Sequence, residues 1–468
     1  MATHDDSDYS VIDKAGMVLG HASAGLVLPG IDETTRTEAT RLCARDHLEH
    51  HVFFNNRGFH NHLNHHLLSV FSMGAPAPRL QEVFDLNRPM QRPPYPLESN
   101  NVAMTASNYH EYFSDERHYP AYVAFFKDEL ERAGHGWKQR AGQYFLDSKV
   151  LPLGMGGLFH PLIQLGYGLE FESKAITATA LAQACVHQPT FQSLFTSNVF
   201  ADMCTTPAAN GGHGVSLMQL LDLIRSDATI ADMPFESSRV PGDIRATAAE
   251  KLAAKYAAMW AVPPTKESIA AKYHELLSVT ALFYGSLTRP GYTQLLHFLV
   301  MHCLTSAYFL PVIFDCMPVV CQAALLKAQS AAVLFFFVRI NAPELHIPPE
   351  LTAIDTHKCV SDDAGPQVTN PWLGVFEQAI ASNDMHVSKV VRSLWRGSLL
   401  DAFAAKQATT DGYELPPQIN WLYLARVTTS TITASSFEDA EAQFKEGKRS
   451  WVFGMVGHDE FWATYPTE

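Results

Sequence analysis

Apolar residues recur three and four positions apart along most of the chain, and this spacing limits the possible folds more than any other feature. The clearest runs cover residues 122–130, 217–224, 252–259 and 269–277. Side chains at this spacing lie on one face of an α-helix, where they can pack against a core. Two adjacent prolines separate the last two runs, as expected where one helix ends and the next begins.

Strand-like alternation is sparse by comparison. Residues 421–429 alternate weakly and are compatible with a short strand or with another helix. The chain has 468 residues, a length that favours two or three domains, although helical enzymes of this size often fold as one unit. We predict an all-α fold, with a single large helical domain over residues 1–468. We expect a lead-in at 1–45, a proline-rich surface loop at 74–104, and further loop insertions at 202–214 and 341–370.

Charge and cysteine content exclude several classes of function. The net charge is −14, and an acidic surface argues against a nucleic-acid groove, which needs clustered Lys and Arg. The N-terminal segment MATHDDSDYS lacks the basic and apolar regions of a signal peptide. The seven cysteines are scattered and form no CxxC pair, which fits a reducing compartment. We therefore expect a cytoplasmic protein, and the sequence does not indicate its oligomeric state.

One apolar stretch, Leu295–Phe314, is long enough to cross a bilayer. It carries two histidines and Pro311, and no basic flank follows it. We interpret it as a buried helix of a large core, and we expect no membrane span. The apolar run at 331–338 is too short to span.

No nucleotide-binding motif is present. The nearest match, Gly154-Met-Gly-Gly157, lacks the third glycine and the βαβ setting of a dinucleotide fold. It is more typical of a tight turn before a helix. The sequence shows no Walker motif, no Gly-x-Ser-x-Gly elbow and no HExxH, so it identifies no cofactor-binding residues.

Four histidines fall within the segment FHNHLNHH. His62 and His66 lie four positions apart, so on a helix they share one face and can bind one cation. A helical wheel turns His65 nearly opposite the apolar stripe and places His60 at the helix start. A polar helix edge with hydrogen-bonded histidines explains the segment equally well.

His160 and His302 each lie in strongly apolar sequence. A buried imidazole needs partners for its ring nitrogens, and one alone is usually a satisfied core residue. Two of them, together with the pair in FHNHLNHH, favour a shared metal. Lys389 has no such support from spacing, because the wheel places it opposite an apolar stripe and an ammonium offers no lone pair. From spacing alone we expect it to be solvated.

Four blocks carry a resemblance over most of the chain: GFHNHLNHHLL, LGMGGLFHPLIQLGYGLEF, HFLVMHCLTSAYFLP and HVSKVVRSL. In this order they resemble the questin oxidase family of fungal polyketide pathways. The family includes the Baeyer–Villiger-type oxidase of aflatoxin biosynthesis and enzymes that cleave anthraquinone rings. The resemblance implies oxygen-dependent opening of an aromatic polyketide quinone, often with NADPH as reductant. For an iron-dependent branch it implies one Fe(II) held by four histidines and a carboxylated lysine, here His62, His66, His160, His302 and Lys389.

Other residues have subordinate roles in this prediction. His297 and His386 lie one helical step from proposed ligands and are the nearest alternatives to them. His297 also departs from the acidic or small residue that the family pattern suggests, and could instead be a hydrogen-bond partner of a ligand. Further candidates near the metal or the substrate are His65, Tyr167 and Arg392, the last two as polar anchors, and Glu170, which would orient a histidine ligand.

These observations predict a non-haem iron oxygenase that cleaves a ring C–C bond of an anthraquinone-type polyketide, with dioxygen as co-substrate. The sequence leaves open a mono- or dioxygenase outcome and the exact substrate. Imidazoles bind iron, zinc and copper alike. A zinc-dependent hydrolase on the same histidines, a metal-free oxidase and a non-catalytic helical protein with structural histidines therefore remain as alternatives.

Overall fold

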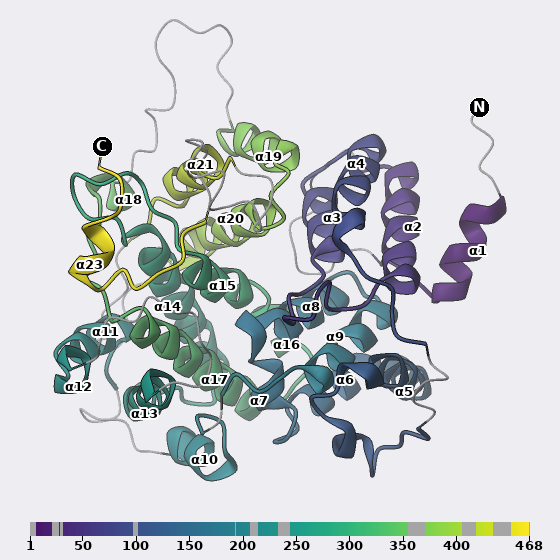
Figure 1. Ribbon diagram of the computed structural model, residues 1–468, viewed down its shortest axis with the longest axis horizontal. Helices are drawn as coiled ribbons and strands as arrows, with labels where there is room; N and C mark the ends of the chain where they lie inside the picture. Colours follow the sequence, from purple (N-terminus) through teal and green to yellow (C-terminus); the bar gives the residue numbers. More distant parts are fainter. Residues whose placement is uncertain are drawn as a thin grey trace, which may run out of the picture. The chain divides into compact units, whose positions relative to one another are not determined.

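The computed structural model is built from α-helices, as the apolar spacing predicted (Figure 1). It describes residues 6–20, 28, 31–96, 102–191, 193–205, 214–232, 244–353, 370–404, 418–433 and 451–467. Within these ranges, strand pairing is limited to isolated bridges such as Phe53–His60 and His297–Val452. Contacts between residues divide the chain into two compact units. The first contains residues 1–191 and 309–321, and the second contains residues 192–308 and 322–468. The expectation of a single domain stays a prediction.

Helices α5, α8 and α9 form the most closely packed group of the first unit, with α9 against both of the others. Glycines allow α8 to approach its neighbours. A Cβ at Gly166 would overlap the ring of Phe309, and one at Gly168 would overlap Thr177. The helices of this unit are α1 (Asp6–Ala15), α2 (Glu33–Glu49), α3 (Leu63–Ser72), α4 (Ala77–Asn87), α5 (Tyr119–Arg132), α6 (Trp137–Phe145), α7 (Leu151–Gly154), α8 (His160–Glu170), α9 (Lys174–Val186) and α16 (Leu310–Phe314).

In the second unit α20 packs against α14, α15, α19 and α21. Helix α17 begins in the first unit at Val319 and continues into the second. The helices are α10 (Ser197–Thr205), α11 (Leu217–Arg225), α12 (Ala228–Ala231), α13 (Ile244–Met259), α14 (Lys266–Gly285), α15 (Phe298–Ala307), α17 (Val319–Arg339), α18 (Pro349–Thr352), α19 (Trp372–Ala381), α20 (Val387–Ala404), α21 (Trp421–Thr431) and α23 (Asp459–Trp462).

Several predicted irregular segments are helical. The prediction of a proline-rich loop over residues 74–104 is wrong for residues 77–87, which form α4. Pro76 is the N-cap residue of this helix and Pro78 lies in its first turn, where the backbone N–H that proline lacks would have no partner within the helix. The lead-in at 1–45 contains α1 and most of α2. The ambiguous segment 421–429 belongs to helix α21. The insertion predicted at 202–214 begins with the last residues of α10, and the one predicted at 341–370 contains the short helix α18. Residues 97–101, 206–213 and 354–369 lie outside the described residues.

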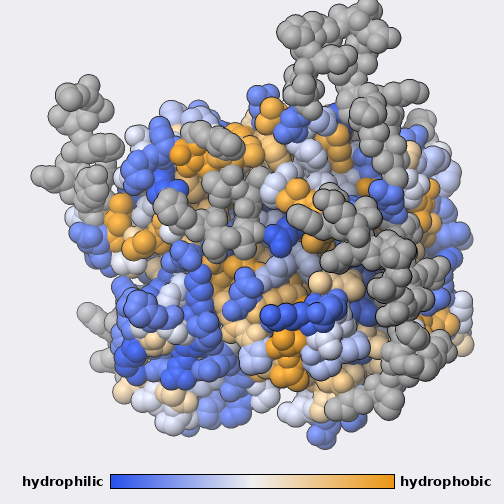
Figure 2. Space-filling model, turned by 180° about the vertical axis from the view of Figure 1, so that it is seen from behind, coloured by the Kyte–Doolittle hydropathy of each residue, from blue (hydrophilic) through white to orange (hydrophobic). Residues whose placement is uncertain are grey.

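The apolar stretch 295–314 is largely buried, as predicted, but it forms two helices, α15 and α16, with Pro311 in the first turn of the second. Among the described residues, one helix, α17, is long and apolar enough to cross a membrane, and 72% of its most apolar window is buried within the protein. A core helix has the same properties. Figure 2 shows hydrophilic and hydrophobic residues interspersed on one face of the molecule, which is ordinary for a protein surface.

Candidate functional site

Two predicted ligands meet in the first unit. His62 is the N-cap residue of α3, and His160 is the first residue of α8. Both side chains are buried, and their Nε2 atoms lie 2.8 Å apart. The two imidazole planes are nearly perpendicular, with ring centroids 4.7 Å apart.

The tautomers of these two rings follow from their other nitrogens. Nδ1 of His62 lies 2.6 Å from the carbonyl oxygen of His60, and Nδ1 of His160 lies 2.6 Å from that of Gly157. A carbonyl oxygen only accepts hydrogen bonds, so each Nδ1 carries the proton, and in a neutral ring Nε2 then has a lone pair. Two lone pairs therefore face one another, an arrangement that requires either an extra proton or a cation between them.

A metal ion fits this donor set. Imidazole nitrogens bind transition metals at about 2.0–2.1 Å, so two of them can share an ion at any separation up to about 4 Å. At this bond length neighbouring ligands lie about 3.0 Å apart at right angles and about 3.4 Å apart in a tetrahedron. The observed 2.8 Å lies within the range that two ligands of one ion can span.

A left-handed turn precedes His160, and it begins at Gly157, the last residue of the GMGG motif that predicted a tight turn before a helix. Gly157, Leu158 and Phe159 have φ of 53°, 55° and 63°. Glycine adopts this conformation freely, whereas Leu and Phe each pay about 1–2 kcal/mol for it. The turn brings the Gly157 carbonyl to His160 Nδ1. Backbone strain of this kind is concentrated at functional sites.

Two further histidines stack on the pair. The ring of His60 lies 4.0 Å from that of His160 and 5.1 Å from that of His187, and both stacks are nearly parallel. His187, the C-cap residue of α9, escaped sequence-based prediction. It is a lone histidine at a helix end, and only its position in space links it to the cluster.

The prediction that His65 points away from the site is wrong. Its ring is buried, 5.7 Å from the ring of His62 and 5.0 Å from that of Tyr167. The wheel failed because every residue of α3 is buried, so a side chain opposite the apolar stripe also faces protein. The Tyr167 hydroxyl pairs with Ser69 Oγ at 2.5 Å, an interaction that links α8 to α3.

His66 and Glu170 occupy other surroundings. His66 donates its backbone N–H to His62, and its Nδ1 lies 3.4 Å from the side-chain amide of Asn87. Its role as a ligand stays a prediction. Glu170 is buried at the end of α8, ten residues beyond His160, or about 15 Å along the helix axis. At that distance it does not reach His160, whose Nδ1 is held by the Gly157 carbonyl, and its role of orienting a histidine ligand stays a prediction.

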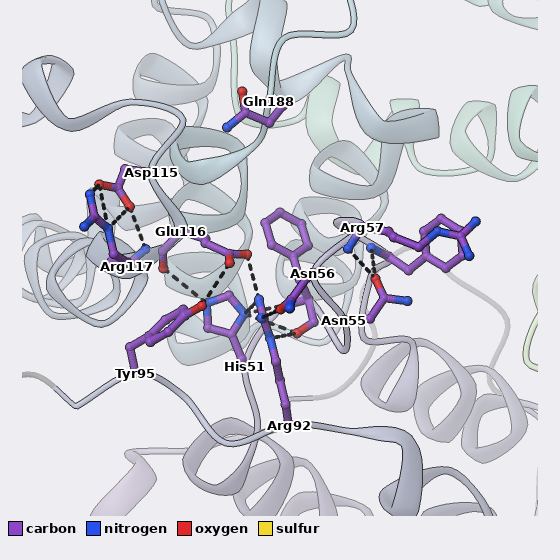
Figure 3. A network of polar contacts seen from close by, with 12 residues as sticks. His51, Asn55, Asn56, Arg57, Arg92, Tyr95, Asp115, Glu116, Arg117 and Gln188 are labelled. Carbon is purple, nitrogen blue, oxygen red and sulfur yellow. Dashed lines mark hydrogen bonds and ion pairs between the residues drawn. The ribbon is translucent and has the colours of Figure 1, made fainter. Parts of the chain in front are cut away.

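A polar network fixes the loop beneath the stacked rings (Figure 3). Arg92 donates to the Phe53 carbonyl at 2.6 Å and to the Glu116 carboxylate at 2.6 Å. Tyr95 donates to the other oxygen of Glu116 at 3.0 Å. The ring of Phe53 in turn lies 5.3 Å from that of His60. The network thus anchors the segment that supports the histidine stack.

The second unit holds another buried cluster. His302, on α15, donates from Nδ1 to the Phe298 carbonyl at 2.8 Å, so its Nε2 also carries the lone pair. The ring of His386 lies 5.3 Å from that of His302. Nδ1 of His386 is 3.5 Å from Asp384, and burial lowers the pKa of this imidazole to about 4. The ring of His386, which the sequence offered as an alternative ligand, thus lies beside that of His302.

Lys389 is not solvated, contrary to the expectation from spacing. Its side chain is only 2% exposed, and Nζ has no hydrogen-bond partner among the described residues. Burial lowers its pKa to about 7, against the opposing effect of Asp384. Residues 384–394 are buried all round, so the wheel again had no solvent-facing side to detect. A neutral amine, the form that this lowered pKa makes available at neutral pH, is the form that can react with carbon dioxide.

The two remaining predicted residues are His297, which contacts backbone groups, and Arg392, which lies beside Tyr308. His297 lies 3.0 Å through Nε2 from the Gly454 carbonyl, and its backbone bridges to Val452. These contacts give it a structural role that needs no metal. Arg392 donates to the Tyr308 hydroxyl at 2.9 Å, with its guanidinium 4.7 Å from the centre of that ring. The sequence did not single out Tyr308.

Of the predicted ligands, His62, His66 and His160 belong to the first unit, and His302 and Lys389 belong to the second. His62 and His160 meet in the first, and His302 and Lys389 are buried in the second. That they share one ion stays a prediction from the family pattern.

Comparison with known proteins connects this arrangement to a family. A sequence model of questin oxidase-like proteins matches residues 59–394. A Baeyer–Villiger oxidase of Emericella nidulans is 28% identical, covering 93% of this chain and 94% of the relative. A questin oxidase of Aspergillus terreus is 27% identical, covering 91% and 92%. An oxidoreductase of Aspergillus parasiticus is 26% identical, covering 78% and 73%. The chain is an oxidoreductase and belongs to the questin oxidase-like family.

Proposed function

We propose that this protein is a metal-dependent oxygenase that opens a ring of an aromatic polyketide quinone. The opposed Nε2 atoms of His62 and His160 carry the proposal, because their lone pairs require a cation or an extra proton. The names of the fungal relatives supply the reaction class, Baeyer–Villiger or questin oxidation. The product would be a lactone or a ring-opened acid.

We propose Fe(II) as the ion, with His62, His66, His160 and His302 as nitrogen ligands. When bound, iron would supply the one-electron chemistry that dioxygen needs to react with a closed-shell quinone or hydroquinone. The protein's own contribution is to hold the lone pairs in place: backbone carbonyls fix Nδ1 of His62, His160 and His302, so that Nε2 remains available.

Lys389 would complete the ligand set as a carbamate. Its neutral amine adds to carbon dioxide, a C–N bond forms and one proton is released, which leaves a carboxylate on the side chain. The lowered pKa and the deep burial of Nζ support this reaction. A carbamate oxygen would take the place that Asp or Glu has in other non-haem iron sites. NADPH is the reductant that the family resemblance suggests.

Arg392 is the proposed anchor for the substrate. A guanidinium is always charged and binds phenolate or carboxylate groups through several N–H donors. Its contact with Tyr308 leaves it oriented by one hydrogen bond and by the ring. A phenolic quinone offers matching acceptors.

Metal analysis combined with oxygen uptake tests the function. Purified protein should contain iron and consume dioxygen together with an anthraquinone from a test panel. Stoichiometric zinc without oxygen uptake would favour the hydrolase, and activity that survives chelation would favour a metal-free oxidase. Absence of both metal and turnover would favour a non-catalytic protein.

A pair of variants links the metal to the histidine pair. His62→Ala should lower iron content and oxygen uptake at least tenfold, because it removes one of the two facing nitrogens. His135→Ala is the matched control, since His135 is exposed and belongs to neither cluster. Equal iron content in the two variants would contradict the assignment.

A further inference from the structure

The GMGG motif leads into the left-handed turn at residues 157–159, and such a turn needs support from outside. Two of its three residues carry side chains that disfavour this conformation. The motif supplies only Gly157, so it does not fix the left-handed conformation of Leu158 and Phe159. Two residues beyond the motif contact the turn, and through it they act on His160.

Thr190 supplies one external contact. Its Oγ1 accepts the backbone N–H of Gly157 at 2.9 Å. This bond fixes the peptide at the start of the turn, three residues before His160. A carbonyl held in this way keeps its direction, and the Gly157 carbonyl is the acceptor for His160 Nδ1.

His187 supplies the other contact. Its imidazole Nε2 occupies the space that a Cβ on Gly157 would fill. The ring cannot swing away, because Nδ1 donates to the Gln188 carbonyl at 2.6 Å and Ser114 Oγ donates to the His187 carbonyl at 2.9 Å. The same ring stacks on His60, which stacks on His160. His187 thus supports both the turn and the imidazole of His160.

We propose that Thr190 and His187 are positioning residues that hold the left-handed turn so that His160 keeps its proton on Nδ1 and its lone pair directed at His62. Thr190 acts through the Gly157 peptide, and His187 acts through Gly157 and through the ring of His60. The functional consequence rests on the proposed metal site, whereas the effect on the His160 tautomer does not.

The first experiment measures metal binding. Cobalt(II) serves as the probe because its visible absorption reports ligand geometry. Thr190→Val removes the acceptor and keeps the side-chain shape, and it should weaken Co²⁺ binding about 10–100-fold and alter the spectrum. Thr190→Ser restores the hydroxyl and should bind almost as the natural protein does. Thr280→Val is the control, since it removes a buried hydroxyl bond to the Leu277 carbonyl within α14, a helix of the second unit.

The second experiment needs no metal. Histidines labelled with ¹⁵N, with His160 assigned by a His160→Gln variant, report which ring nitrogen carries the proton. In the metal-free protein Nδ1 of His160 should stay protonated, with the extra proton shared between the facing Nε2 atoms of His62 and His160, whereas Thr190→Val and His187→Ala should show a population of His160 that lacks the Nδ1 proton.

The two experiments separate the possible failures. An unchanged His160 tautomer in both variants would overturn the positioning role, whatever the cobalt result. A changed tautomer in a protein that binds no Co²⁺ would support the positioning role and contradict the proposed metal function. If His187→Ala does not fold, Thr190→Val alone decides.

Discussion

The histidines of the two clusters share one pattern at the scale of single residues. His62, His160 and His302 each direct Nδ1 at a backbone carbonyl oxygen, at 2.6, 2.6 and 2.8 Å. Such a bond fixes both the tautomer and the plane of an imidazole, and metal ligands commonly have one. Sequence spacing cannot reveal it, because the acceptor depends on the local backbone. Sequence blocks identified these histidines, and the structure supplies the reason they are suited to a metal.

Lys389 gives a prediction at the same scale. Its folded-state pKa of about 7 is below the ordinary value for lysine, so the charged form of its side chain destabilises the folded protein at neutral pH. In metal-free, carbon dioxide-depleted buffer, Lys389→Met should raise the free energy of unfolding by roughly 2–4 kcal/mol. In protein supplied with iron and carbon dioxide, the same variant should abolish oxygen uptake.

The sign of the pH effect provides a control for Lys389. The unfolded chain binds the proton more readily between pH 7 and 10.5, so the stability of the natural protein should rise through this range. Lys389→Met should lack this rise. Urea unfolding at pH 7 and pH 9.5 measures both, and a variant that is less stable at pH 7 would refute the buried-charge argument.

Helices with one exposed face are the elements that sequence spacing predicted well. The runs at 122–130, 217–224 and 269–277 correspond to α5, α11 and α14. Spacing failed for α3 and for the start of α20, which are buried on every side. A helical wheel assigns the face opposite the apolar stripe to solvent, and that assumption has no meaning in a fully buried helix. The surroundings of His65 and Lys389 were therefore beyond such reasoning.

Two glycines in helices give opposite predictions. A Cβ at Gly397, on α20, would overlap the ring of Trp421, whose Nε1 is held by Asp401 at 2.5 Å. Gly397→Ala should destabilise the protein by about 1–3 kcal/mol through overpacking. Gly374, at an exposed position of α19, has nothing within 4 Å of its Cβ site. Gly374→Ala should stabilise by about 0.5–1 kcal/mol, because alanine favours the helix. Thermal unfolding compares the two, and equal melting temperatures would contradict the packing of α20 on α21.

The whole molecule contains several histidines that burial keeps neutral. Burial lowers the pKa of His297 to about 4, and the same holds for His47. The unfolded chain takes up these protons near pH 6.5, before the folded protein does, so stability is lost as pH falls from about 6.5 to about 4. Each group contributes up to about 3 kcal/mol to that loss.

His297→Gln should therefore reduce the dependence of stability on pH. The amide can still donate to the Gly454 carbonyl, but it does not titrate. The urea midpoints measured at the chosen pH values of 7.0, 5.5 and 4.5 should differ less from one another in the variant than in the natural protein. His135→Gln, at an exposed position, should leave the dependence unchanged.

The burial of α3 has a kinetic consequence. His62 caps a helix in which all ten residues are buried, and its partner His160 begins another buried helix. We expect an ion held between them to leave only when this part of the chain opens, because both imidazoles are buried. Its release should then proceed at a rate that stops increasing with chelator concentration and increases instead with sub-denaturing urea. A release rate proportional to chelator concentration throughout would show that the ion sits within reach of solvent.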